Sequence, residues 1–291
     1  MKQRKAYTYA ILSVLCWSTV GSAFKITLRY FDFLNLLLFS SFVATCVLLA
    51  TILIQKQRHL LKLITQKDLL HSAFLGFLNP FLYYVVLFKA YDLLPAQEAA
   101  TLNYSWPLAL VLFSIPMLKQ KIGILSIIAI FVSFTGIIII STHGHILDLR
   151  FSSPLGVSLA IGSAVIWAFF WIFNMRDKRE PVTKLFLNFF FGFLYILITV
   201  LIQGDFRIPP WQGLAGSVYV GFLEMGITFV LWLKALTYSS TTAKVTNLIY
   251  LAPFMSLVFI HFFVGETIFL STFVGLLFII GGILMQRSVK S

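Results

Sequence analysis

The sequence predicts an all-α polytopic membrane protein whose ten transmembrane helices form two inverted five-helix repeats. Three observations lead to this prediction. The chain of 291 residues is 59% hydrophobic and only 11% charged, whereas a soluble domain carries about 25% charged residues. Uncharged stretches long enough to cross a bilayer follow one another along the chain. The second half of the sequence also repeats features of the first half.

The gaps between charged residues locate the helices. A membrane-spanning helix needs roughly 18 or more apolar residues without a charge. Ten windows reach this length, and Glu224 interrupts one of them: 6–24, 33–55, 69–88, 99–118, 122–147, 151–175, 185–204, 208–233, 245–265 and 267–286. The strands of a membrane β-barrel would instead alternate apolar and polar residues in segments of about ten. We therefore expect helices, with no room for a soluble domain.

The basic residues predict the orientation. If the N-terminus is cytoplasmic, ten helices place 17 of the 22 Lys and Arg residues on the cytoplasmic side and 5 outside. This bias fits the positive-inside rule, so we expect both termini in the cytoplasm and a place in a bacterial inner membrane. The net charge of +12 is then explained by topology and by lipid headgroups, and no nucleic-acid partner is expected. Lys25, at the outer end of the first helix, is expected to extend to the headgroups.

The repeat is clearest in the third helix of each half. GFLNPFLYYVVLFKA at 76–90 and GFLEMGITFVLWLKA at 221–235 share six identities at an offset of 145. After a one-residue insertion, LNYSWP at 102–107 aligns with LIYLAP at 248–253, and Trp17 corresponds roughly to Trp167.

An odd number of helices per repeat means that the second repeat enters the membrane from the opposite side. The sequence thus predicts a first repeat over 1–146 and an inverted second repeat over 147–291. Inverted repeats are typical of secondary transporters, whose substrate binds near the midplane between the halves.

These features resemble the drug/metabolite transporter superfamily, and specifically its ten-helix EamA-type exporters. The early Trp and the Leu-x-Tyr-x-x-Pro turn occur in both halves, and Gly-Glu-Thr at 265–267 is followed by Gly275 and Gly281-Gly282. The first half departs from the pattern, with Lys119-Gln120-Lys121 where the family often has an acid. The resemblance implies a central cavity lined by helices 1, 3, 4, 6, 8 and 9, with helices 5 and 10 at the side. It also implies export of amino acids, amines or related small metabolites.

Glu224 is the strongest candidate site residue, because it is the one acidic residue well inside a predicted span. A charge at the bilayer centre costs at least about 2.5–3.5 kcal/mol, so such a residue faces a cavity or a partner. Asn79 occupies the equivalent position in the first repeat, and Asn cannot titrate whereas Glu can. Glu224 is therefore expected to bind a proton or the amino group of a substrate; the alternative is a structural hydrogen bond between helices.

Other polar and aromatic residues lie at similar depth. Pro107 and Pro253 interrupt membrane helices at mirrored positions and are candidate gating hinges. The remaining candidate substrate-binding residues are polar or aromatic side chains beside these features: Tyr83, Trp17, Ser18, Asn103, Trp106, Trp167, Trp171, Asn247 and Tyr250. For each of them, ordinary helix packing is the alternative.

The leading function is a secondary transporter or facilitator for a small-molecule substrate, with protons as a candidate coupling ion. An antiporter for sugar phosphates or nucleotide-sugars would need buried Lys or Arg at the centre, and the basic residues lie at helix ends. A channel would need a charge ring. A membrane-embedded enzyme would need a carboxylate pair, a metal cluster or a phosphate loop, which the sequence lacks. We therefore expect no enzyme activity, cofactor or metal, and a monomer or homodimer in contact with membrane lipids.

Overall fold

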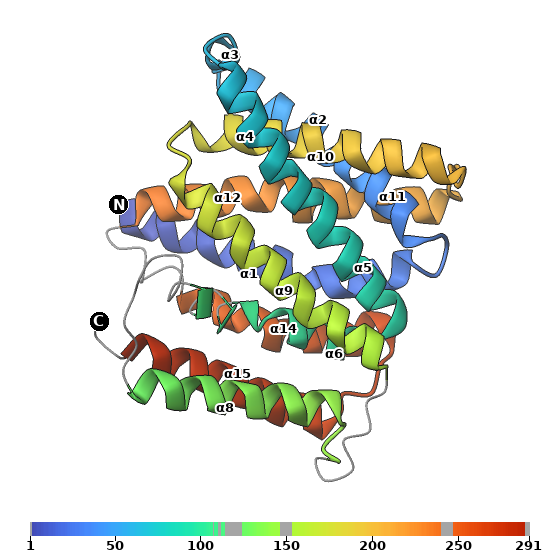
Figure 1. Cartoon of the computed structure of the whole chain (residues 1–291), viewed down its shortest axis with the longest axis vertical. Coiled ribbons are helices and arrows are strands. Elements are labelled where there is room, and N and C mark those ends of the chain that lie inside the picture. Colours follow the sequence, from blue (N-terminus) through green and yellow to red (C-terminus); the bar gives the residue numbers. More distant parts are fainter. Residues whose placement is uncertain are drawn as a thin grey trace.

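The computed structural model describes residues 2–106, 108–109, 112–113, 124–145, 153–239 and 247–288, and these are helical with short connections (Figure 1). This confirms the all-α membrane class. Six helical segments are long and apolar enough to cross a membrane: Lys2–Thr27, Phe33–Ile54, Gln66–Leu93, Pro154–Asn174, Pro181–Gln203 and Trp211–Ala235. Three shorter apolar helices are Ile128–Ile140, Ala252–Val264 and Leu270–Met285. The remaining window, 99–118, runs into residues outside the described set.

In the first half the elements are α1 (Lys2–Thr27), α2 (Phe33–Ile54), α3 (Arg58–Leu61), α4 (Gln66–Gly76), η1 (Phe77–Leu82), α5 (Tyr83–Leu93), α6 (Ala96–Asn103) and α8 (Ile124–Ser141). In the second half they are α9 (Pro154–Arg176), α10 (Pro181–Gln203), α11 (Trp211–Tyr219), η2 (Val220–Ile227), α12 (Thr228–Tyr238), η3 (Asn247–Leu251), α14 (Ala252–Phe259), η4 (Ile260–Val264) and α15 (Leu270–Ser288).

Local chemistry sets several helix starts. Asp32 caps α2 by accepting hydrogen bonds from the amides of Leu34 and Asn35. Glu180 caps α10 in the same way, followed by a proline in the first turn. These side chains satisfy amides that have no partner inside the helix. Along the apolar stretches the helix satisfies its own backbone polar groups, as a lipid environment requires.

The helices α8 and α15 form a separate pair at the side of the molecule (Figure 1). Glycines allow the close approach: a Cβ on Gly136 would meet the carbonyl of Gly275, and a Cβ on Gly282 would meet Ser133. Small residues of this kind are typical of packing between membrane helices. The arrangement agrees with the side position that the family resemblance implies for helices 5 and 10.

The other helices surround the centre of the molecule. α1 packs along α12, α5 along α9, and α10 along α2 and α4. Each of these contacts joins an element of the first half to one of the second. The main hydrophobic core therefore draws on both halves, with Phe24 and Tyr84 from the first and Phe170 and Phe189 from the second.

Candidate functional site

Two interrupted helices carry the strongest candidate residues, Asn79 and Glu224. The α-helical hydrogen bonding of the third span is broken by the π-type segment η1, and that of the eighth by the π-type segment η2. The sequence predicted continuous helices over both windows, so this is a correction. Asn79 lies in η1 with extended backbone angles, φ −152° and ψ 120°, and Glu224 lies in η2. The third span is thus kinked at Asn79, and π segments such as η2 are frequent at functional sites.

Glu224 is buried, with 8% of its surface exposed, and has one partner. The hydroxyl of Tyr84 donates a hydrogen bond of 3.1 Å to Oε1, while Oε2 has none among the described residues. Thr228, one helical turn further along, also has a buried hydroxyl without a partner there. Oε1 of the carboxyl group is thus hydrogen-bonded to Tyr84, and Oε2 can still form a hydrogen bond or an ion pair.

Asn79 is completely buried, and neither atom of its amide has a hydrogen-bond partner within the described part of the chain. A buried polar group left unpaired costs about 1–3 kcal/mol. Buried side-chain groups in this condition are few in native proteins and call for a specific explanation. A solute that supplies the missing partners is one such explanation.

A second polar chain begins at the neighbouring tyrosine. The Tyr83 hydroxyl donates to Oδ1 of Asn103 at 3.2 Å, and Nδ2 of Asn103 donates to the Ser163 hydroxyl at 2.8 Å. The chain therefore joins α5, α6 and α9. Two of the predicted residues, Tyr83 and Asn103, are in direct contact, whereas Ser163 was missed because a serine in an apolar run carries no distinctive sequence signal.

Aromatic rings connect the remaining predicted residues. The Tyr83 ring lies over Trp167 with centroids 4.6 Å apart, and Phe229 contacts both Trp167 at 5.9 Å and Trp17 at 6.0 Å. Trp171 contacts Trp167, and its indole nitrogen has no partner among the described residues. Rings from α1, α5, α9 and α12 thus meet beside the polar residues.

Several predicted residues fit the site less directly. Ser18 is buried, but its hydroxyl donates to the Val14 carbonyl of its own helix. Trp106 is partly buried against the main core. Pro253 lies in the first turn of α14, directly after the 3₁₀ segment η3. Pro107 lies outside the described residues, and so do the side chains of Asn247 and Tyr250.

Two further acids lie near helix ends: Glu98, to which the sequence pattern gave no role, and Glu266, which belongs to the Gly-Glu-Thr motif at 265–267. Glu98 is completely buried and lies 2.7 Å from Nε2 of His143. Glu266 accepts hydrogen bonds from the amides of Ala96 and Gln97 at the start of α6. Both acids fall at window boundaries, where the sequence pattern alone is typical of exposed loops.

Lys25 also corrects an expectation. Its ammonium group donates to the carbonyls of Tyr91 and Leu94, each at 2.7 Å. It therefore satisfies the carboxyl end of α5, whose last carbonyls have no partner within the helix. It does not extend freely toward headgroups.

Comparisons with known proteins agree with this architecture. The model of the EamA-like transporter family matches residues 4–142 and again residues 154–287. An "Uncharacterized transporter" of Clostridium kluyveri is 23% identical over 98% of this chain and 94% of its own length. Another, from Archaeoglobus fulgidus, is 23% identical over 98% of both chains.

The "Uncharacterized transporter YvbV" of Bacillus subtilis is 26% identical over 72% of this chain and 69% of its own. A solved crystal structure with 21% identity superposes with a TM-score of 0.68 over 98% of each chain, which shows a common fold. Groups of three or more His, Cys, Asp or Glu residues suited to a metal are absent from the described residues. With the family model matching nearly the whole length in two copies, this chain belongs to the EamA-like transporter family and is an integral membrane transporter.

Proposed function

We propose that this protein moves a small metabolite bearing an amino group, such as an amino acid or an amine, across the membrane by alternating access. The observation that carries the proposal is the buried Glu224 carboxyl group, held by Tyr84 from the other half and open on its second oxygen. An ammonium group or a proton would complete its interactions. Export is the direction that the family resemblance implies.

The predicted inverted repeats, with boundaries at 1–146 and 147–291, would permit an alternating mechanism. The family model matches once in each half, and the sequence alignment pairs Asn79 with Glu224. In this proposal the two halves open in turn to each side around the residues at the centre. The rings of Tyr83, Trp17 and Trp167 form the walls, and Asn79 and Asn103 supply polar contacts.

The alternative within transport is an antiporter for phosphorylated compounds, which would need cationic side chains around the substrate. The hydrogen-bond partner of Glu224 is instead the Tyr84 hydroxyl, and the neighbouring Tyr83 packs against Trp167. Lys184, a buried lysine, is committed to the carbonyls of Asn174 and Asp177 at a helix end. The arrangement therefore favours a cationic or zwitterionic substrate, carried rather than chemically altered.

A ligand screen tests the substrate class. Purified protein is heated with amino acids, amines, sugar phosphates and nucleotides, and a ligand that binds only the folded state raises the melting temperature. At 100 times its Kd, a ligand adds about 2.7 kcal/mol of stability. We expect stabilisation by compounds with an amino group. Stabilisation by phosphorylated compounds alone would overturn the proposal.

The variant Glu224→Gln then tests the role of the acid. It keeps the side-chain shape and removes the charge, so we expect it to abolish the stabilisation by the identified amine and the pH dependence of its transport. Asn79→Ala should cost less. Asp92→Asn, which removes an exposed carboxylate paired with Lys89, is the matched control. If Glu224→Gln transports at the wild-type rate with the same pH profile, the acid is a structural contact only.

We expect the proposed hinges at Pro107 and Pro253 to affect the rate of transport rather than the affinity for the substrate. Proline removes one backbone hydrogen bond and loosens a helix locally, and the described hinge lies where η3 changes to α14. Pro253→Ala is expected to slow transport more than it weakens ligand binding in the thermal assay. Unchanged turnover would leave this proline as a packing feature.

A further inference from the structure

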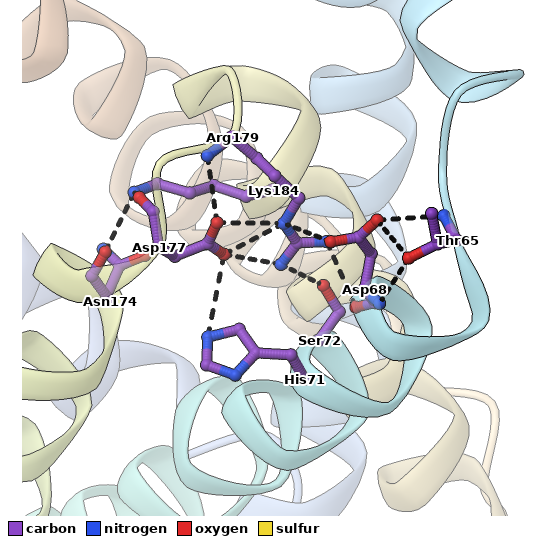
Figure 2. Close-up of polar contacts among 8 residues, drawn as sticks. All are labelled: Thr65, Asp68, His71, Ser72, Asn174, Asp177, Arg179 and Lys184. Carbon is purple, nitrogen blue, oxygen red and sulfur yellow. Dashed lines mark hydrogen bonds and ion pairs between the residues drawn. The ribbon is translucent and has the colours of Figure 1, made fainter.

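A cluster of charged and polar side chains lies at the end of the molecule at which α1 begins and α15 ends. Figure 2 shows it between the start of α4 and the segment that joins α9 to α10. Beyond the charge bias to which Arg179 and Lys184 contribute, the sequence pattern gives these residues no role. The cluster comprises Thr65, Asp68, His71, Ser72, Asn174, Asp177, Arg179 and Lys184.

Arg179 is the centre of the cluster. Its guanidinium group binds both carboxylate oxygens of Asp177, with Nη2 2.5 Å from Oδ2 and Nε 3.0 Å from Oδ1. The same group reaches α4: Nη2 donates to the Ser72 hydroxyl at 2.8 Å, and Nη1 donates to the Asp68 carbonyl at 3.1 Å. The Asp68 carboxylate lies 3.8 Å from Nε. One side chain of the second half is thus tied to α4 of the first half.

This arrangement is more than a surface ion pair. The Asp177 side chain is only 4% exposed and that of Arg179 only 17%, and the pair has the two-pronged geometry that makes Arg–carboxylate contacts strong. Lys184 donates to the carbonyls of Asn174 and Asp177, which fixes the loop. His71 lies 3.8 Å from Asp177 and adds a further positive charge to those of Arg179 and Lys184 when it is protonated.

The other end of the molecule has a different contact at the corresponding place. Arg179 directly precedes Glu180, the cap of α10, and Phe31 directly precedes Asp32, the cap of α2. The offset of the repeat pairs Asp68 with Gly213 and His71 with Gly216. The Phe31 ring lies over Gly213 so closely that a Cβ there would overlap it, and Thr27 covers Gly216 in the same manner. At the other end of the molecule, the place that corresponds to the Arg179 contact is therefore taken by the Phe31 ring packed against Gly213.

From this we infer that the two ends are closed by different chemistry: Arg179, bound to Asp177, Ser72 and Asp68, is an ionic latch at one end, and Phe31 on Gly213 is an apolar closure at the other. The inference rests on the proposed alternating access, in which each end opens in turn, so that weakening one closure does not increase opening of the other end. An ionic latch weakens when the charge of Arg179 is removed, because the buried carboxylate of Asp177 is then left without its partner. An apolar contact does not weaken in this way.

Two cysteine reporters test the latch without a substrate. Leu75 and Val220 are both fully buried, they are paired by the repeat offset, and each lies just inside one of the two closures. Leu75→Cys and Val220→Cys are made separately in a Cys16→Ser, Cys46→Ser background. Each protein is placed in nanodiscs of phosphatidylethanolamine and phosphatidylglycerol, and its reaction with a water-soluble maleimide is timed. Both ends are accessible in nanodiscs, so membrane orientation does not affect the result.

The latch variant is Arg179→Gln, and its matched control is Lys178→Gln, which removes the same charge from an exposed neighbour. Since labelling of a buried thiol follows local opening, we expect Arg179→Gln to speed labelling at Leu75→Cys by about tenfold or more and not to speed labelling at Val220→Cys. Phe31→Ala should speed labelling at Val220→Cys and should not speed it at Leu75→Cys.

Two results would overturn the latch. An unchanged rate at Leu75→Cys would mean that the cluster does not control opening of this end. Faster labelling at both reporters would mean that Arg179 stabilises the whole fold. Because the assay contains no substrate, failure of the latch leaves the ligand screen and the Glu224 test intact, and the reverse also holds.

Discussion

At the scale of single residues, two differences between the repeats meet at the centre of the molecule. Glu224 replaces the amide of Asn79, and Tyr84 carries a hydroxyl where the second half has Phe229. The hydroxyl of Tyr84 donates to the carboxyl group of Glu224. Tyr84 comes from the first half and Glu224 from the second. The mirrored pair, Phe229 and Asn79, could not form this hydrogen bond, because Phe229 has no hydroxyl group.

A double-mutant cycle measures this pair. Tyr84→Phe substitutes the residue of the other repeat, so its volume fits, but it leaves a buried carboxyl oxygen without a donor. We expect a loss of about 1–3 kcal/mol in the free energy of unfolding. In a Glu224→Leu background the same change should be nearly neutral, because both partners are then absent. Tyr83→Phe, whose hydroxyl contacts Asn103 instead, should show no such coupling; equal losses for Tyr84→Phe in both backgrounds would contradict the pair.

Asp177 predicts a pH dependence of the ionic cluster. Burial alone would raise the pKa of this loop carboxyl group, but hydrogen bonds and charge from Arg179 outweigh burial and hold the pKa below its ordinary value of 3.8. A carboxylate with a lowered pKa stabilises the fold above its unfolded pKa, and the contribution disappears as the pH falls through the folded pKa.

The measurement is the difference in melting temperature between the wild type and Asp177→Asn from pH 7 to pH 3. It should stay constant down to about pH 5 and shrink below about pH 4, as the unfolded chain and then the native carboxylate take up protons. A difference that persists undiminished at pH 3 would show that Asp177 acts through its shape alone.

At the scale of elements, glycines decide which helices can approach one another. α8 and α15 pack backbone to backbone, with Gly282 against Ser133 and the carbonyl of Ala129. The adjacent Gly281 faces open space. Because Gly281 and Gly282 are neighbours in the same helix, comparing the same substitution at both positions separates the effect of packing from that of helix propensity.

Gly282→Ala and Gly281→Ala form a matched pair. Gly282→Ala pushes a methyl group into the partner helix, and overpacking of this kind costs about 1–3 kcal/mol. Gly281→Ala meets no atom and should be neutral or stabilising by up to about 1 kcal/mol, since alanine is the better helix former. Thermal unfolding in detergent gives both values. Equal effects of the two substitutions would show that α8 and α15 separate easily.

At the scale of the whole molecule, the distribution of charge predicts how the protein lies in the membrane. The short connections around Arg58 and Lys178 belong to the end at which α1 begins, where most of the Lys and Arg residues are predicted to lie. Both side chains are exposed, so cysteines can replace them without disturbing the core.

Arg58→Cys and Lys178→Cys, each in the background without native cysteines, should therefore not react with an impermeant maleimide added outside intact cells. Both should react once the membrane is opened, because the positive-inside rule places these connections in the cytoplasm. A control cysteine at Phe206, exposed in the opposite connection, should react in intact cells. Labelling of either connection from outside would refute the predicted topology.

The sequence by itself determined the membrane class and the positions of most helices, because long uncharged windows are a local property that lipid contact requires. It also singled out Glu224, since an acid inside such a window is costly and therefore conspicuous. Only the tertiary structure decided which groups meet: Tyr84 with Glu224, Glu98 with His143 and Arg179 with Asp68 join residues far apart in the chain. The interruption at Asn79 and the burial of Glu98 likewise depend on how neighbouring helices pack, and no short stretch of sequence encodes that packing.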